Sequence, residues 1–137
     1  MASSSLLFVC TGNSCRSQMA EGFARRRLGT AALVASAGTE PAATVHPRAI
    51  AEMARRGIDI SAGYPKRIAE LNTADFDLVI TVCDHAQENC PVVPGAKMLH
   101  WSFPDPADAV GTEEEVAAVF RRVADDIEDH ITELLGA

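Results

Sequence analysis

Two residues near the start of the chain have the types and the spacing to bind and attack an oxyanion. Cys10 and Arg16 enclose five residues in the segment Cys-Thr-Gly-Asn-Ser-Cys-Arg, and Ser17 follows directly. Gly12 lets the backbone curl, so that successive N–H groups can converge on an anion. The planar guanidinium of Arg16 suits a tetrahedral oxyanion. The expected oxyanion-binding residues are Thr11, Gly12, Asn13, Ser14, Cys15, Arg16 and Ser17, with Cys10 as the nucleophile.

The elements on either side of this segment support that expectation. Residues 5–10 read as a short buried strand and residues 17–28 as a helix, with Gly29 just beyond its end. A helix start supplies unpaired N–H groups and the positive end of a dipole. We expect these features to lower the pKa of Cys10 and to hold it as a thiolate, which is the reactive form. The alternative is a buried cysteine in an ordinary strand-to-helix turn.

The rest of the chain alternates strands and helices, which predicts an α/β fold with a parallel sheet covered on both faces. Further strands are expected at residues 32–37, 77–83 and 97–101, and helices at 47–56 and 66–71. Thr112 and Glu115 form a capping box for a long final helix with one apolar stripe. Ligands of such sheets bind at the carboxyl ends of strands, where Cys10 and Cys83 both fall.

Composition limits the classes of partner. The 137 residues fit one domain, 1–137, and a formal net charge of −7 disfavours nucleic acid and anionic membranes. No segment has the length of a membrane-spanning helix, and the first ten residues lack the basic start of a signal peptide. We therefore expect a cytoplasmic protein acting as a monomer. Its four cysteines then suggest metal binding, catalysis or packing, because structural disulfides are rare there.

Residues 9–22, Val-Cys-Thr-Gly-Asn-Ser-Cys-Arg-Ser-Gln-Met-Ala-Glu-Gly, resemble the signature loop of the low-molecular-weight tyrosine phosphatase fold. They resemble more closely the thioredoxin-coupled arsenate reductases built on that fold. The likeness continues at residues 36–38, 46–47, 59–61, 77–83, 90–91 and 100–107. It implies a three-layer α/β/α domain, a four-stranded parallel sheet and a loop that holds arsenate, with phosphate or sulfate able to occupy it. It implies thioredoxin as the reductant and no cofactor.

The resemblance also assigns catalytic roles outside the loop. Asp105, between two prolines that exclude a helix, is implied to be the general acid for the leaving oxygen. Without the resemblance, a turn aspartate beside proline is the simpler interpretation. Cys83 is implied to attack Cys10, and Cys90 then to attack Cys83, leaving a Cys83–Cys90 disulfide for thioredoxin. Two isolated thiols are the alternative.

The spacing of the two later cysteines carries a geometric consequence. If residues 83–90 were helical, the seven-residue offset would separate the two Cα atoms by roughly 10.5 Å along the axis. A disulfide needs about 4.4–6.8 Å, so the segment must bend or unwind when it is oxidised. Zinc is disfavoured because the chain has no C-x2-C pair and Arg16 would oppose a cation. We expect Cys15 only to pack under the loop.

Several residues are expected to support the loop. Asn13 tolerates a left-handed backbone, and Ser17 could donate to Cys10, cap the helix, or do both. Glu21 and Ser36 resemble residues that, with Asn13, form a potassium site in some relatives. Where those relatives place an acidic residue, this chain has Gly-Tyr-Pro-Lys-Arg at 63–67. Lys66 could supply a tethered ammonium near Glu21 instead, or be an ordinary solvated lysine.

Three functions remain open at this point. The first is a thioredoxin-coupled arsenate reductase, and the second is a tyrosine phosphatase in which Cys83 and Cys90 are incidental. Two features stand against the phosphatase. Gln18 occupies a position where many phosphatases have proline, and the segment directly after Asp105 lacks the aromatic residues that commonly help such enzymes hold a phosphotyrosine ring. The third is a non-catalytic redox or oxyanion sensor, which the retained Asp105 disfavours.

Overall fold

Four parallel strands form the centre of the molecule. The computed structural model describes residues 5–90 and 93–136. The strands are β1 (Leu6–Cys10), β2 (Val34–Gly38), β3 (Leu78–Thr81) and β4 (Lys97–His100), in the spatial order β2-β1-β3-β4. Every neighbouring pair is parallel. The predicted fold class, an α/β protein with a four-stranded parallel sheet, is confirmed.

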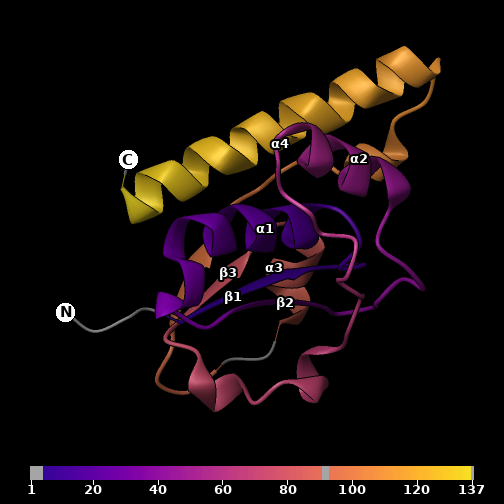
Figure 1. Ribbon diagram of the computed structural model, residues 1–137. Coiled ribbons are helices and arrows are strands. Elements are labelled where there is room, and N and C mark those ends of the chain that lie inside the picture. Colours follow the sequence, from indigo (N-terminus) through magenta and orange to yellow (C-terminus); the bar gives the residue numbers. More distant parts are fainter. Residues whose placement is uncertain (1–4, 91–92, 137) are drawn as a thin grey trace.

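The described helices are α1 (Arg16–Leu28), α2 (Pro47–Arg55), α3 (Asp84–Asn89) and α4 (Glu113–Leu135), with short 3-10 helices at Gly29–Ala31, Ile68–Glu70, Thr73–Asp75 and Pro106–Asp108. Helices α1, α2 and α4 gather on one side of the sheet (Figure 1). Helix α4 begins with the predicted capping box of Thr112 and Glu115. Within residues 5–90 and 93–136, no helix combines the length and the apolar character needed to cross a membrane.

The two faces of the sheet contact different helices. The ring of Phe8 lies 6.3 Å from that of Trp101, which in turn lies 5.2 Å from the ring of His130 on α4. Thr81 is in register with the residue after Phe8, so its side chain points to the opposite face. There its hydroxyl lies 2.8 Å from Nδ1 of His100, whose Nε2 lies 2.9 Å from the first residue of α3. The sheet is therefore the middle of three layers.

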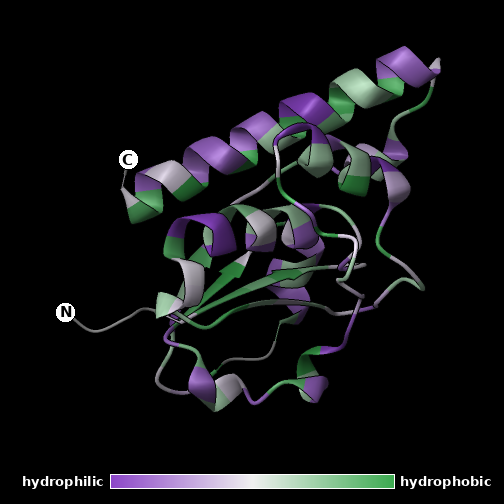
Figure 2. Cartoon of the chain, viewed as in Figure 1, coloured by the Kyte–Doolittle hydropathy of each residue, from purple (hydrophilic) through white to green (hydrophobic). Residues whose placement is uncertain are grey.

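The apolar core runs along the central strands. All five residues of β1 are buried, and Leu6 to Val9 are completely inaccessible. Figure 2 shows these strands as mostly apolar, whereas α4 alternates between apolar and polar residues along its length. The buried residues of α4 follow a helical spacing, at Phe120, Val123, Ala124, Ile127 and Ile131. The predicted apolar stripe of the final helix is confirmed at these positions.

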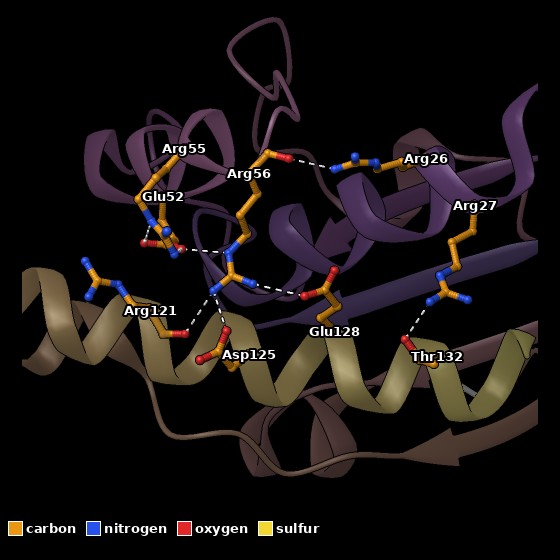
Figure 3. A network of polar contacts seen from close by, with 9 residues as sticks. All are labelled: Arg26, Arg27, Glu52, Arg55, Arg56, Arg121, Asp125, Glu128 and Thr132. Carbon is orange, nitrogen blue, oxygen red and sulfur yellow. Dashed lines mark hydrogen bonds and ion pairs between the residues drawn. The ribbon is translucent and has the colours of Figure 1, made fainter. Parts of the chain in front are cut away.

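A buried carboxylate connects α2 to α4 through arginine side chains (Figure 3). Glu52 is 7% exposed and accepts hydrogen bonds from Arg55 at 2.7 Å and from Arg56 at 2.6 Å. Arg56 also donates to Asp125 at 2.6 Å and to Glu128 at 3.0 Å, both on α4. Because every partner is charged and hydrogen-bonded, the buried carboxylate is compensated.

Three elements differ in detail from the sequence expectations. The helix expected at 66–71 is a 3-10 helix of three residues, Ile68–Glu70. Strand β3 ends at Thr81, so Cys83 lies two residues beyond the strand rather than at its end. Residues 84–89 form the helix α3, for which Cys83 is the N-cap. The thiol of Cys83 accepts from the N–H of Ala86, and this bond explains why the chain turns into a helix directly after the strand.

Candidate active site

The segment from Cys10 to Arg16 forms a tight loop between β1 and α1. Cys10 is the last residue of β1, and residues 11–15 are a series of bends. Asn13 has φ of 51°, which confirms the expected left-handed conformation. This turn directs the N–H of Asn13 back to Sγ of Cys10, at 3.1 Å. The strand end and the helix start thus position a thiol beside inward-turned backbone donors.

A second donor to Cys10 comes from the first turn of α1. Oγ of Ser17 lies 2.8 Å from Sγ of Cys10. The same oxygen accepts a bond from Nδ2 of Asn13 at 2.7 Å, which leaves the serine hydrogen available for the sulfur. The N-cap of α1 is Cys15, so Ser17 is not the capping residue. Of the two roles considered for Ser17, the contact with Cys10 is the one that the structure contains.

The expected low pKa of Cys10 is wrong for the loop as it stands. Burial raises the pKa of this thiol above its ordinary value, while the hydrogen bonds from Ser17 and Asn13 and the charge of Arg16 act in the opposite direction. Because Cys10 is only 2% exposed, loss of hydration outweighs the donors. Proximity of donors was visible in the sequence, but the depth of burial was not.

Arg16 and Asp105 lie together above the loop. Arg16 is 8% exposed, and its Nη1 donates to the carbonyl of Phe103 at 3.1 Å. Its Nη2 lies 3.5 Å from Oδ2 of Asp105. The other carboxylate oxygen of Asp105 accepts from the N–H of Ala107 at 3.0 Å, which fixes the orientation of the side chain. Two residues that lie 89 positions apart in the sequence are thus brought together, with the Asp105 side chain 34% exposed.

A hydrogen-bonded layer supports the loop from behind. Nδ2 of Asn13 donates to Ser36 at 2.9 Å, and Ser36 donates to Glu21 at 2.6 Å. The N–H of Lys66 donates to Oδ1 of Asn13 at 3.0 Å, and its ammonium donates to the carbonyl of Ser36 at 3.1 Å. Burial lowers the pKa of Lys66, although the carboxylates of Glu21 and Glu70 counteract this effect. The expected supporting residues therefore form one connected group.

Gln18 belongs to this group, although the sequence did not single it out for that role. It is 2% exposed, and its Nε2 donates to the carbonyls of Asn13 at 3.1 Å and of Tyr64 at 3.2 Å. Gly63 packs directly on it, since a Cβ at that position would lie 2.7 Å from Oε1 of Gln18. Gln18 thus ties the left-handed residue of the loop to the segment before Lys66. Its carbonyl partners are distant in sequence, so no local pattern marks the role.

Cys83 reaches the loop from the neighbouring strand. The N–H of Val82 bonds to the carbonyl of Val9 at 2.8 Å, so the chain beyond β3 continues alongside the end of β1. Sγ of Cys83 lies 3.2 Å from the hydroxyl of Thr11, the residue after Cys10. Cys83 is 4% exposed. The structure therefore brings the thiol of Cys83 to the rim of the loop formed by residues 10–16, hereafter the oxyanion loop.

Cys90 lies at the other end of α3 and Cys15 lies under the loop. Cys90 is the C-cap of α3 and is half-buried, and burial raises the pKa of its thiol. Cys15 is 3% exposed, and burial raises its pKa to about 12. The structure contains no disulfide among the four cysteines. Among the side chains of residues 5–90 and 93–136, no group of three or more His, Cys, Asp or Glu residues is placed to hold a metal ion.

Comparison with known proteins agrees with this geometry. The family model described as low molecular weight phosphotyrosine protein phosphatase matches residues 5–137. The chain belongs to this family. It is 50% identical over 123 residues to an arsenate reductase of Halalkalibacterium halodurans, covering 89% of this chain and 88% of the relative.

Two solved structures extend the comparison. An arsenate reductase in its oxidised state superposes with a TM-score of 0.82 at 34% identity, over 96% of each chain. A thioredoxin-dependent arsenate reductase of Corynebacterium glutamicum gives a TM-score of 0.75 at 28% identity, over 98% of this chain and 60% of the other. The curated relative and both of these solved structures are described as arsenate reductases.

Proposed function

We propose that this chain reduces arsenate to arsenite with three of its cysteines and with thioredoxin as the final reductant. The observation that carries the proposal is the contact of Cys83 with Thr11, which places a second thiol beside the Cys10 loop. A phosphatase of this fold needs the loop, Arg16 and an acid, but not a second thiol at the rim. The similarity to proteins named arsenate reductase, one of them described as thioredoxin-dependent, supports the same assignment.

In the first step, arsenate binds to the N–H groups of residues 11–17 and to Arg16, and Sγ of Cys10 attacks arsenic. One oxygen leaves as water, protonated by Asp105, whose carboxyl is held at the guanidinium of Arg16. The thiol proton of Cys10 is released in the same step and restores the protonation of the acid. Ser17 and the N–H of Asn13 stabilise the sulfur as negative charge develops on it.

In the second step, Cys83 attacks the sulfur of Cys10. The pair of electrons in the sulfur–arsenic bond goes to arsenic, which leaves as arsenite, and a Cys10–Cys83 disulfide forms. Thr11 is in position to accept the thiol hydrogen of Cys83 or to donate to its thiolate. Cys83 is also the N-cap of α3, and its sulfur accepts a hydrogen bond from the N–H of Ala86 at 3.4 Å.

In the third step, Cys90 attacks Cys83 and releases Cys10 as a thiol. The new Cys83–Cys90 disulfide closes the two ends of α3 on each other, so the helix cannot keep its length. Thioredoxin then donates two electrons and two protons to this disulfide and restores both thiols. Because the reaction needs a pool of reduced thiols, we place the protein in the cytoplasm. All the proposed residues lie on one chain, so a monomer suffices.

The proposal is tested by a coupled assay. Protein, arsenate, thioredoxin, thioredoxin reductase and NADPH are mixed, and the loss of NADPH is followed. We expect no turnover for Cys10→Ser, Cys83→Ser or Cys90→Ser, and sustained turnover for the wild type. Cys15→Ser is the matched control, because it removes a thiol outside the proposed disulfide exchange and keeps the backbone N–H of residue 15 that the loop offers to the oxyanion. In the absence of thioredoxin, Cys90→Ser should release about one arsenite per chain and retain a Cys10–Cys83 disulfide detectable by mass spectrometry. Normal turnover by Cys83→Ser would contradict the relay, which is the proposed transfer of the disulfide from Cys10–Cys83 to Cys83–Cys90.

We further propose that the ammonium of Lys66 supports the loop in place of a bound cation. It donates to the carbonyl of Ser36 next to Glu21, behind Asn13. Wild-type activity should then be the same in sodium and in potassium buffers at equal ionic strength. Lys66→Ala should lose activity in sodium and recover part of it in potassium. Strong potassium activation of the wild type would contradict this role.

A further inference from the structure

We propose that Glu40 and His85 form a latch that holds α3 against the oxyanion loop and makes the Cys83–Cys90 disulfide easier to reduce. Nε2 of His85 lies 2.9 Å from Oε2 of Glu40. The inference rests on the proposed function, because it presupposes that Cys83 and Cys90 form a disulfide. Neither residue is assigned to the oxyanion site, so both act as positioning residues.

One half of the latch is fixed to the oxyanion loop. The N–H of Glu40 donates to the carbonyl of Thr11 at 2.9 Å. The N–H of Thr39 donates to the carbonyl of Cys10 at 3.1 Å. Two residues later, the N–H of Ala42 bonds to the carbonyl of Gly12 at 2.9 Å. The segment carrying Glu40 therefore follows the loop residue by residue and has its backbone position set by it.

The other half belongs to the helix that must change. His85 is the second residue of α3, and its carbonyl accepts a bond from the side chain of Asn89 at 2.8 Å. A cavity of about 680 Å³ adjoins the latch between α3 and the segments around Thr39 and Arg67. The exposed side of α3 therefore has room to rearrange, and the latch is a tie across an open groove rather than a part of the packed core.

The latch stabilises the dithiol form of Cys83 and Cys90 more than the disulfide form. The helical, reduced form contains the His85–Glu40 contact. A seven-residue offset in an ideal helix corresponds to roughly 10.5 Å along the axis, whereas a disulfide requires the Cα atoms of Cys83 and Cys90 to lie within about 4.4–6.8 Å. Unwinding of α3 moves His85 away from Glu40, which remains fixed on the loop. The contact therefore stabilises the dithiol relative to the disulfide, which raises the reduction potential of the pair.

The size of the effect follows from exposure. The side chains of His85 and Glu40 are 46% and 69% exposed, and pairs this exposed shift an equilibrium by roughly two- to fivefold. A tenfold change in the equilibrium constant of a two-electron couple corresponds to about 29.6 mV, so removal of the latch should lower the potential by about 9–21 mV. The same contact helps to keep Cys83 next to Thr11 for the second step.

The experiment measures the potential of the Cys83–Cys90 pair directly. Protein carrying Cys10→Ser and Cys15→Ser, which leaves only two thiols, is equilibrated in buffers of reduced and oxidised dithiothreitol. The thiols are then trapped by alkylation and counted by mass spectrometry. Glu40→Gln, His85→Gln and the double variant are compared in this background. Glu88→Gln, an exposed carboxylate of the same helix, is the matched control.

We expect Glu40→Gln, His85→Gln and the double variant each to be about two- to fivefold harder to reduce than the parent, with Glu88→Gln unchanged. Equal effects of the single and double variants show that the residues act as one unit. Unchanged potentials in Glu40→Gln and His85→Gln, or additive effects in the double variant, would overturn the latch while leaving the relay intact. Failure to form any Cys83–Cys90 disulfide would overturn the relay itself and the latch with it.

Discussion

The oxyanion loop and helix α3 lie side by side but are held in place differently. In the loop, the buried Asn13 bonds through its backbone and its side chain to five neighbours: Cys10, Ser17, Gln18, Ser36 and Lys66. Helix α3 has six residues, and its first two, Asp84 and His85, are exposed and reach out to His100 and Glu40. The loop is built to keep one shape, whereas α3 is tied by contacts that are easily broken.

This difference corresponds to the two halves of the proposed chemistry. An oxyanion is recognised by donors that already point at it, so a fixed loop avoids reorganisation during the attack by Cys10. Transfer of a disulfide between sulfurs requires the sulfurs to approach each other, so the segment from Cys83 to Cys90 has to move. The proposed chemistry therefore needs a fixed oxyanion loop beside a segment that can move, and the two meet at the contact between Thr11 and Cys83.

The largest expected effect separates chemistry from binding within the fixed region. Asp105→Asn should lower kcat by roughly 10²–10⁴, because an amide cannot protonate the leaving oxygen. Its side chain is 34% exposed, so stability should hardly change. Steady-state assays with saturating thioredoxin provide the measurement. Asp108→Asn, an exposed carboxylate in the 3-10 helix Pro106–Asp108 that Asp105 caps, serves as the control. Equal kcat values for Asp105→Asn and Asp108→Asn would show that Asp105 is not the general acid.

A pair of asparagines compares the two regions directly. Asn13→Ala should lower the free energy of unfolding by about 2–4 kcal/mol, because it removes three side-chain hydrogen bonds in a buried site. Asn89→Ala removes one exposed bond within α3 and should cost less than about 0.5 kcal/mol. Urea denaturation of the reduced proteins measures both. Similar losses would show that the loop and the helix do not differ in this way.

The pH dependence of stability tests a third site, the buried carboxylate between α2 and α4. Burial raises the pKa of Glu52, but the hydrogen bonds and charges of Arg55 and Arg56 outweigh burial and hold the pKa below its ordinary value. Glutamate in the unfolded chain titrates near pH 4.3, so the stabilisation is present above about that pH and is lost as the pH falls through the lower, folded value.

The corresponding variant is Glu52→Gln. At pH 7 it should lose about 1–3 kcal/mol of unfolding free energy, and the gap to the wild type should narrow below about pH 4. Glu133→Gln, on the exposed side of α4, is the control. The reduction potential of the Cys83–Cys90 pair should be unchanged in both. A shift in potential for Glu52→Gln would mean that the α2–α4 contact is coupled to the relay.

Much of the scaffold could be predicted because its signals are local. The apolar runs at residues 5–10 and 77–83, the capping box at Thr112 and the glycine after α1 each mark an element within a few positions of where it lies. The left-handed Asn13 was predictable for the same reason. Residues 83–90 were harder, because their helix depends on the capping contact of Cys83 with the N–H of Ala86.

What could not be predicted depends on contacts between distant segments. Donors near Cys10 suggested a low pKa, but only packing determines how much water the thiol loses, and burial raises its pKa instead. The bonds of Gln18 to Tyr64 and of Arg16 to the carbonyl of Phe103 connect segments 46 and 87 residues apart. No periodicity or motif reports such partners, and they are the ones that orient the site.

Amide hydrogen exchange on the reduced protein and on the protein with a Cys83–Cys90 disulfide tests the contrast between loop and helix most directly. The N–H groups of Gln87 and Cys90 bond to carbonyls of Cys83 and Ala86 in the reduced form. We predict that oxidation removes the protection of residues 84–90 and leaves that of residues 11–18 unchanged. Unchanged protection at 84–90, with the disulfide verified by mass spectrometry, would contradict the account.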